Sequence, residues 1–334
     1  MKRFLLPEQG TCYKANLHCH STLSDGEQTP EEIKRDYKAY GYSVVAYTDH
    51  DIMIPHHDLT DEDFLALTGY EMEVGAVDGP VKGKKFCHMC LIALDPDKRE
   101  QVCYHRTRYL YHNAVNYRDQ LCFDHSLPDY VRQYSHEGIS DMMRTGRENG
   151  FFVTYNHPNL SLETGADFMG YEHMHAMEMG NTNSVLEGFP DDYNGKEYDQ
   201  MLRGGKRIFC IATDDNHTRA DRYGAFTVIK AEKLDYKTIT DALLAGHFYA
   251  SRGPEIHELW VENGRIYITC SDAERIVMST GIRKAEIVCA PEGGSLNAAD
   301  FEIDPDCIYV RLTVYDREGM YAATNAYFAE ELFG

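Results

Sequence analysis

Short apolar runs alternate with helix-like patterns through the first 250 residues, and this alternation is the main structural signal in the chain. The runs predict strands at residues 13–18, 43–48, 66–71, 85–93, 151–156, 175–179, 207–212 and 225–230. The intervening patterns predict helices at residues 29–41, 104–120, 138–149, 194–204 and 236–246. Strands that alternate with helices imply parallel pairing, in an open sheet or a barrel, and therefore an α/β fold.

The helix predicted near residue 30 has the best-defined start. Thr29 suits the N-cap, Pro30 the first helical position, and Glu31 and Glu32 the first turn. Gly41 is expected close to its end.

The pattern changes at SRGPEI, residues 251–256. Beyond it, short apolar runs are separated by turn signals, including Asn263-Gly264, which predicts a hairpin. We therefore predict two domains, an α/β domain over residues 1–250 and a small β-sandwich-like domain over residues 251–334.

Composition and charge narrow the class of protein. The chain has 334 residues, of which 54 are Asp or Glu and 33 are Lys or Arg, giving a formal net charge of −21. This charge disfavours long nucleic acids and anionic membranes as partners. No apolar run is long enough to span a bilayer, and MKRFLLPEQG lacks a signal-peptide core. The oligomeric state is left open.

Ten cysteines include one C-x-x-C spacing, Cys87 to Cys90. It lies inside the apolar run KFCHMCLIAL, which is typical of a buried strand rather than of a zinc knuckle or redox turn. We therefore expect reduced, structural cysteines and a cytoplasmic protein.

The segment NLHCHSTLSDG carries the strongest chemical signal. His18 and His20 are two residues apart at the end of a predicted strand, so their imidazoles point to the same side and Cys19 points to the other. Two imidazoles aimed at one point can chelate a metal, and Asp25 follows after a turn.

Other predicted strands deliver similar side chains, most of them at the carboxyl end, where functional sites of α/β sheets and barrels lie. They are Asp49, His50 and Asp51; Glu71 and Glu73; His88; His157; and Asp214, Asp215 and His217. The remaining histidines are expected to be solvated or structural, and His125 is the first of them to check.

Mixed histidine and carboxylate ligands without thiolates suit zinc, manganese or iron. These candidate ligands exceed what one ion takes and suit two or three divalent ions. Clustered ions of this kind support hydrolysis by a metal-bound hydroxide.

At these residues the chain resembles the PHP (polymerase and histidinol phosphatase) family of metal-dependent phosphoesterases. HCHSTLSDG, TDHD, YNHP and DDNH resemble its four motifs, and GYEMEV and FCHMCL resemble the positions between them. The resemblance covers residues 12–230 and implies a distorted (β/α)7 TIM-like barrel with a dinuclear or trinuclear site. A weaker resemblance extends to the β-rich C-terminal part.

The ligands that the resemblance implies are His18, His20, Asp25, His50, Glu71, His88, His157, Asp215 and His217. Spacing in the last motif selects Asp215, and Asp214 stays open as an alternative or as a supporting residue. Glu71 is expected to bridge metals, Asp49 to orient a ligand histidine and Arg219 to meet a phosphate.

The expected function is hydrolysis of a small phosphomonoester or nucleotide-type substrate. One alternative keeps the metal site but cleaves a non-phosphate ester or an amide. Another is a regulatory or ligand-binding module with a non-catalytic metal site. The substrate itself is not predicted, and residues 97–140 offer no motif.

Overall fold

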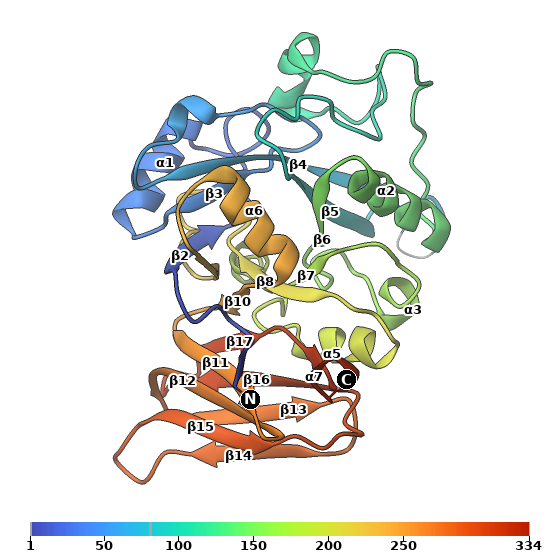
Figure 1. Ribbon diagram of the computed structural model, residues 1–334. Helices are drawn as coiled ribbons and strands as arrows, with labels where there is room; N and C mark the ends of the chain where they lie inside the picture. Colours follow the sequence, from blue (N-terminus) through green and yellow to red (C-terminus); the bar gives the residue numbers. More distant parts are fainter. Residues whose placement is uncertain (1, 80–81, 334) are drawn as a thin grey trace.

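The computed structural model describes residues 2–79 and 82–333 as an α/β fold with a long mixed sheet (Figure 1). Its first strands are β2 (Thr11–Asn16), β3 (Val44–Tyr47), β4 (Leu65–Gly75), β5 (Phe86–Ala93), β6 (Phe151–Tyr155), β7 (Ala176–Asn181), β8 (Phe209–Thr213) and β9 (Phe226–Ala231). The helices are α1 (Pro30–Ala39), η1 (His57–Leu59), η2 (His112–Gln120), α2 (His136–Glu148), α3 (Gly165–Phe168), α4 (Thr182–Leu186), α5 (Gly195–Arg203) and α6 (Tyr236–Ala245). The predicted strands are confirmed, with ends shifted by a few residues.

Helix α1 begins as its sequence predicts. The Thr29 hydroxyl accepts a hydrogen bond from the Glu32 amide at 3.3 Å, and the Glu32 carboxylate accepts one from the Thr29 amide at 3.2 Å. This reciprocal pair is a capping box, and it satisfies two amides that an isolated helix end leaves unpaired. Ile33 and Tyr37 form the buried face of the helix.

The helix predicted at residues 104–120 is wrong for its first half. Only the 3-10 helix η2 is present, and residues 104–111 are irregular. Cys103, Tyr109 and His112 have positive φ values of 52°, 72° and 46°, which an α-helix of L-residues does not allow. The segment instead places its polar groups on neighbouring elements, as described below.

The prediction of parallel pairing holds for β2–β3, β3–β4, β6–β7 and β7–β8. It is wrong for β4–β5, β5–β6 and β2–β9, which are antiparallel. Residues 76–85 are too few for a crossover helix, so β5 runs back along β4. Because β5 is reversed, β6 is antiparallel to it while restoring the direction of β4.

A closed barrel is not confirmed. The hydrogen-bonded path that runs from β2 through β3, β4, β5, β6 and β7 ends at β8. Over residues 2–79 and 82–333, β8 has no ladder with β2 or β9, and an isolated bridge between Cys19 and Asn216 links the two ends. The fold is therefore a strongly curved mixed sheet that is open along one seam.

The strands after residue 247 continue this sheet and add a second one. They are β10 (Phe248–Ser251), β11 (Ile256–Glu262), β12 (Arg265–Ala273), β13 (Arg275–Thr280), β14 (Ala285–Cys289), β15 (Leu296–Glu302), β16 (Tyr309–Tyr315), β17 (Tyr321–Thr324) and β18 (Tyr327–Phe328), followed by α7 (Ala329–Phe333). Strand β17 pairs with β10, and the N-terminal strand β1 (Arg3–Phe4) pairs with β11. The hairpin at Asn263-Gly264 is confirmed, with both residues at positive φ.

The first and last described elements, β1 and α7, lie among these C-terminal strands, in the lower part of Figure 1. The largest hydrophobic core also crosses the predicted boundary at residue 251. Tyr309, Tyr321 and Phe328 pack in the same cluster as Met177 of β7 and Cys210 of β8. The division into two domains stays a prediction, but the two parts share a sheet and a core.

Two further observations concern composition. Cys87 and Cys90 are buried free thiols on β5, and the other cysteines within residues 2–79 and 82–333 form no disulfide either. None of the helices in these ranges is long and apolar enough to cross a lipid bilayer.

Candidate metal centre

His18 and His20 follow β2 and lie in the middle of a buried cluster of imidazoles and carboxylates. Their Nε2 atoms are 3.1 Å apart, and both are 3.1 Å from Oδ1 of Asp215. Glu71 on β4 adds Oε1 at 3.2 Å from His18 and Oε2 at 3.4 Å from His20. Four ligand atoms bonded at ~2.1 Å around one tetrahedral ion lie about 3.4 Å from each other. These four side chains therefore have the spacing of one metal site.

Backbone pairing explains why these residues meet. The Asp215 amide donates to the His18 carbonyl at 3.0 Å, and the His20 amide donates to the carbonyl of Asn216 at 3.1 Å. The chain after β8 is thereby fixed alongside the chain after β2. Asp215 has a positive φ of 53°, a turn that directs its side chain to the cluster while Asp214 faces elsewhere.

Glu71 also contacts a second set of histidines. Its Oε1 lies 3.2 Å from Nδ1 of His88 and 3.5 Å from Nε2 of His157. Its Oε2 lies 3.3 Å from Nδ1 of His50. One carboxylate thus reaches imidazoles that come from several different strands and the turns after them.

A third group lies closer to solvent. Asp25 has Oδ1 at 3.6 Å from Nδ1 of His20 and Oδ2 at 3.7 Å and 3.6 Å from Nε2 of His50 and His217. These four side chains form one set whose ligand atoms all lie within 4.8 Å of one another. The structure therefore brings all nine predicted ligand residues into one cluster.

The electrostatics of the cluster fit a cation. Burial by itself raises the pKa of the Glu71 carboxyl, but His18, His88 and His50 outweigh it and hold that pKa well below its usual range. Asp215 behaves in the same way: burial opposes ionisation, while His18 and His20 lower its pKa. Both acids are therefore ionised and available as ligands.

Unpaired atoms point to the same conclusion. Among the described residues, Nδ1 of His20, Nδ1 of His50 and Oδ1 of Asp215 are buried without a hydrogen-bond partner. Buried polar atoms are rarely left unpaired, because each costs ~1–3 kcal/mol. A divalent ion held among these atoms removes that cost, so the donor set fits metal.

Glu178 on β7 is part of the cluster and was not predicted. Its Oε1 lies 2.7 Å from Nδ1 of His18, and its Oε2 accepts from the His157 amide at 2.9 Å. A carboxylate on one ring nitrogen fixes the tautomer and aims the other nitrogen at the metal. The one signal in the sequence is an acid inside the apolar strand AMEMGN.

Asp49 does not orient a ligand histidine. Its carboxylate accepts hydrogen bonds from the amides and hydroxyls of Ser21 and Ser24 at 2.7–3.2 Å. These bonds fix the turn between His20 and Asp25. The predicted orienting role belongs instead to Glu178.

Asp214 and Arg219 both lie outside the cluster. Asp214 accepts hydrogen bonds from Tyr37 and Thr182 side chains and from the amides of the turn at residues 223–225. The guanidinium of Arg219 bonds Glu32 and Asp36 of α1. The predicted phosphate contact of Arg219 has no support in this geometry.

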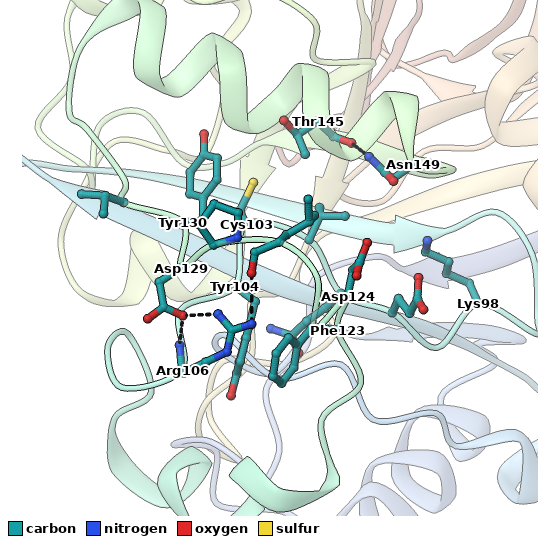
Figure 2. A pocket seen from close by; sticks show the side chains of 16 residues that line it. Lys98, Cys103, Tyr104, Arg106, Phe123, Asp124, Asp129, Tyr130, Thr145 and Asn149 are labelled. Atoms are coloured by element: carbon teal, nitrogen blue, oxygen red, sulfur yellow. Dashed lines mark hydrogen bonds and ion pairs between the residues drawn. The ribbon is translucent and has the colours of Figure 1, made fainter.

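One apolar cavity is separate from the cluster of candidate ligands. About 440 Å³ in volume, it lies between residues 98–131 and α2, as Figure 2 shows, with Tyr104, Phe123 and Tyr130 on its walls. None of the nine predicted ligands lines it. His125, exposed beside Phe123, lies on this side of the molecule and not in the cluster.

No protein-family model and no curated protein matches this chain. Several solved structures do. A two-domain protein from Bacteroides vulgatus, described as containing a PHP-like metal-dependent phosphoesterase, is 15% identical over 96% of this chain and 88% of its own, with a TM-score of 0.45. A protein from Bifidobacterium adolescentis that bears the name metal-dependent phosphoesterase is 14% identical over 63% of this chain and 89% of its own, with a TM-score of 0.35.

A lesion-specific endonuclease from Pyrococcus furiosus, EndoQ, is 12% identical over 70% of this chain and 56% of its own, with a TM-score of 0.40.

Proposed function

We propose that this protein is a metal-dependent phosphoesterase that hydrolyses a small phosphomonoester at a centre of two or three divalent ions. The observation that supports this most is Glu71. Both of its oxygens lie 3.2–3.5 Å from imidazole nitrogens, which belong to His18, His20, His50, His88 and His157.

The contacts suggest how the ligands divide among ions. The first ion takes His18, His20, Glu71 and Asp215, which form one compact set. A second would take Glu71 together with His88 and His157, whose nitrogens both lie within 3.5 Å of its Oε1. The third takes the more exposed set of Asp25, His50 and His217.

Bound ions of this kind supply a nucleophile from water near neutral pH and neutralise phosphoryl oxygens. The residues of the chain hold the geometry. Glu178 fixes His18, and Asp49 fixes the turn that carries Asp25. Each pre-positions a ligand, which lowers the reorganisation needed when metal or substrate binds.

The test combines metal analysis with a substrate panel. The full-length protein is loaded with manganese or zinc and assayed on phosphomonoesters, phosphodiesters, carboxylic esters and amides. We expect hydrolysis of monoesters, with more than one divalent ion per chain. His20→Ala and Asp215→Ala are expected to lose most of this hydrolysis together with bound metal.

His125→Ala is the matched control, because this histidine is exposed and lies outside the cluster. It should keep both metal and activity. Full activity in a metal-free His20→Ala/Asp215→Ala double variant contradicts the proposal. Turnover of carboxylic esters or amides alone moves the protein to a different hydrolase class.

A further inference from the structure

The segment from Gln101 to Arg132 is attached at both ends to residues beside the cluster. The Gln101 side chain accepts from the Met53 amide at 3.2 Å and donates to the Asp51 carbonyl at 3.0 Å. Arg132 forms a buried ion pair with Asp51 and donates to the Glu73 carbonyl at 2.8 Å. Asp51 directly follows His50 in the chain, and Glu73 lies two residues after Glu71 on β4. Both anchors are therefore next to predicted ligands.

The middle of the segment is also fixed. The Asn113 amide donates to the Ser24 carbonyl at 3.0 Å, and its side chain donates to the Thr22 carbonyl at 3.1 Å. Ala114 and Leu121 pack with Ile52 in a small core of their own. The segment, which includes η2 at the top of Figure 1, therefore rests on the turn that carries Asp25.

Tyr111 is the residue of this segment that faces the cluster. Its ring centroid lies 5.1 Å from that of His50. Its hydroxyl makes no hydrogen bond to any residue in the ranges 2–79 and 82–333. The Tyr111 ring therefore lies against a predicted metal ligand, and its hydroxyl is free to bond a molecule held at the cluster.

The other tyrosines nearby have different surroundings. The Tyr109 hydroxyl accepts from the Arg132 amide at 3.0 Å, so it is part of the anchor. Tyr104 stacks on Phe123 and lines the separate apolar cavity. Tyr111 alone in this comparison combines proximity to the cluster with a free donor.

We propose that Tyr111 is a substrate-contacting residue, whose phenol donates a hydrogen bond to a phosphoryl oxygen of an ester bound at the cluster. This inference rests on the proposed function and adds to it a residue that contacts the substrate and selects monoesters. Phenols are hydrogen-bond donors, and bonds to a charged oxygen are the stronger kind.

The same contact limits substrate size. The segment is held by side-chain bonds at Gln101, Asn113 and Arg132, so Tyr111 forms a fixed wall on one side of the cluster. A phosphodiester carries a substituent on each side of phosphorus, whereas a monoester carries one. A wall on one side therefore favours monoesters over diesters and over internal positions of a nucleic acid.

The test uses the metal-loaded, full-length protein and three variants. Tyr111→Phe removes only the hydroxyl, Tyr111→Ala removes the wall, and Tyr104→Phe is the matched control within the same segment. Calorimetry measures the Kd for inorganic phosphate, and metal content is determined in parallel. Steady-state assays give kcat/KM for p-nitrophenyl phosphate and for bis(p-nitrophenyl) phosphate.

We expect Tyr111→Phe to weaken phosphate binding and lower kcat/KM for the monoester about tenfold or more, as for a lost bond to a charged group. Its metal content should match the wild type, and Tyr104→Phe should change neither quantity. Tyr111→Ala should raise the ratio of diester to monoester kcat/KM.

Two results overturn the inference while leaving the proposed function intact. One is a Kd for phosphate in metal-loaded Tyr111→Phe that equals the wild-type Kd, because the hydroxyl then makes no contact with phosphate. The other is an unchanged ratio of diester to monoester kcat/KM in Tyr111→Ala, because the Tyr111 ring then does not limit substrate size. A wild-type protein that neither binds phosphate nor hydrolyses either ester contradicts the proposed function, and the inference with it.

Discussion

Glu178 is not one of the predicted ligands, but it positions one of them, His18. It is fully buried on β7 and accepts from the Thr213 hydroxyl, the Asn181 side chain and the His157 amide as well as bonding His18. With three other donors around it, the carboxylate has little freedom to move. The orientation of His18 is therefore set by β7 and β8 and not by β2 alone.

Replacing Glu178 should weaken metal binding without removing a ligand. In Glu178→Gln the new amide group faces donors that need an acceptor. The hydrogen bond that orients the His18 ring is therefore lost. We expect metal affinity to fall about 10–100-fold. Titration with a competing chelator measures it. Glu187→Gln, on the exposed turn after α4, is the control, and equal affinities in the two variants refute this role.

His175 makes stability depend on pH. Its ring stacks on Phe152, and its Nδ1 accepts from the Val153 amide at 3.0 Å, which requires the neutral ring. Burial, helped by Arg147, lowers the pKa of His175 to about 3. The unfolded chain binds this proton near pH 6.5, so the contribution to stability is complete above that pH and declines below it.

We therefore expect the free energy of unfolding to lose about 1–2 kcal/mol from this residue between pH 7 and pH 5. Urea unfolding of the wild type and of His175→Gln at both pH values isolates the contribution of His175 to the free energy of unfolding. Glutamine keeps an acceptor but does not titrate, so the difference between the two proteins should shrink at pH 5. A difference that is the same at both pH values contradicts the assignment.

The candidate ligands could be predicted because histidines and acids recur just after apolar runs. HCHSTLSDG, TDHD and DDNH all follow buried strands, and strand ends meet at one edge of a sheet. Glu178 could not be predicted, because the strand AMEMGN contains a single acid and no second acid or histidine at a ligand spacing. Asp49 and Arg219 were placed beside the ligands by sequence proximity, but their hydrogen bonds go to Ser21, Ser24 and α1.

At the scale of elements, α1 carries its own folding signal. The capping box of Thr29 and Glu32 pairs amides at the start of the helix. Thr29→Ala is expected to cost about 1 kcal/mol in the free energy of unfolding. Chemical denaturation checks this, and Thr11→Ala, at the exposed first residue of β2, is the comparison. A loss below a few tenths of a kcal/mol would show that tertiary contacts alone fix the helix start.

The segment at residues 101–132 was the least predictable element for a physical reason. Its backbone and side chains bond to Tyr70, Asp51 and Ser24, all far away in the sequence. Local patterns carry no information about such partners. The antiparallel turn from β4 into β5 was missed in a similar way, because the strand pattern marks where strands lie but not their direction.

At the scale of the whole molecule, strands β10 and β17 join the metal-bearing sheet to the C-terminal strands. Tyr249, Ala250 and Ser251 pair with Thr324, Ala323 and Ala322. A chain ending at residue 251 would expose the edge of β10 and lose Tyr309, Tyr321 and Phe328 from the main core. Exposed edges and missing core side chains both favour aggregation over folding.

We expect such a truncated chain to be insoluble, or to lack a cooperative thermal transition. Circular dichroism and calorimetry measure this. The control is a chain ending at residue 328, which loses α7 and the surface ion pairs of Arg207 with Glu330 and Glu331. Because exposed pairs contribute little, this chain should still melt cooperatively. A cooperative transition in the 251-residue chain would show that the first part folds by itself.

The pairing of β2 with β9, and the bridge from Cys19 to Asn216, bring together residues that are synthesised at very different times. His18 and His20 leave the ribosome early, but Asp215 and His217 follow about 200 residues later. At ~5–20 residues per second, that gap corresponds to roughly 10–40 s. Throughout this interval the nascent imidazoles lack the acid that completes their set. In the proposed centre, the full set of ligands therefore exists only after β8 and the turn that follows it have been translated.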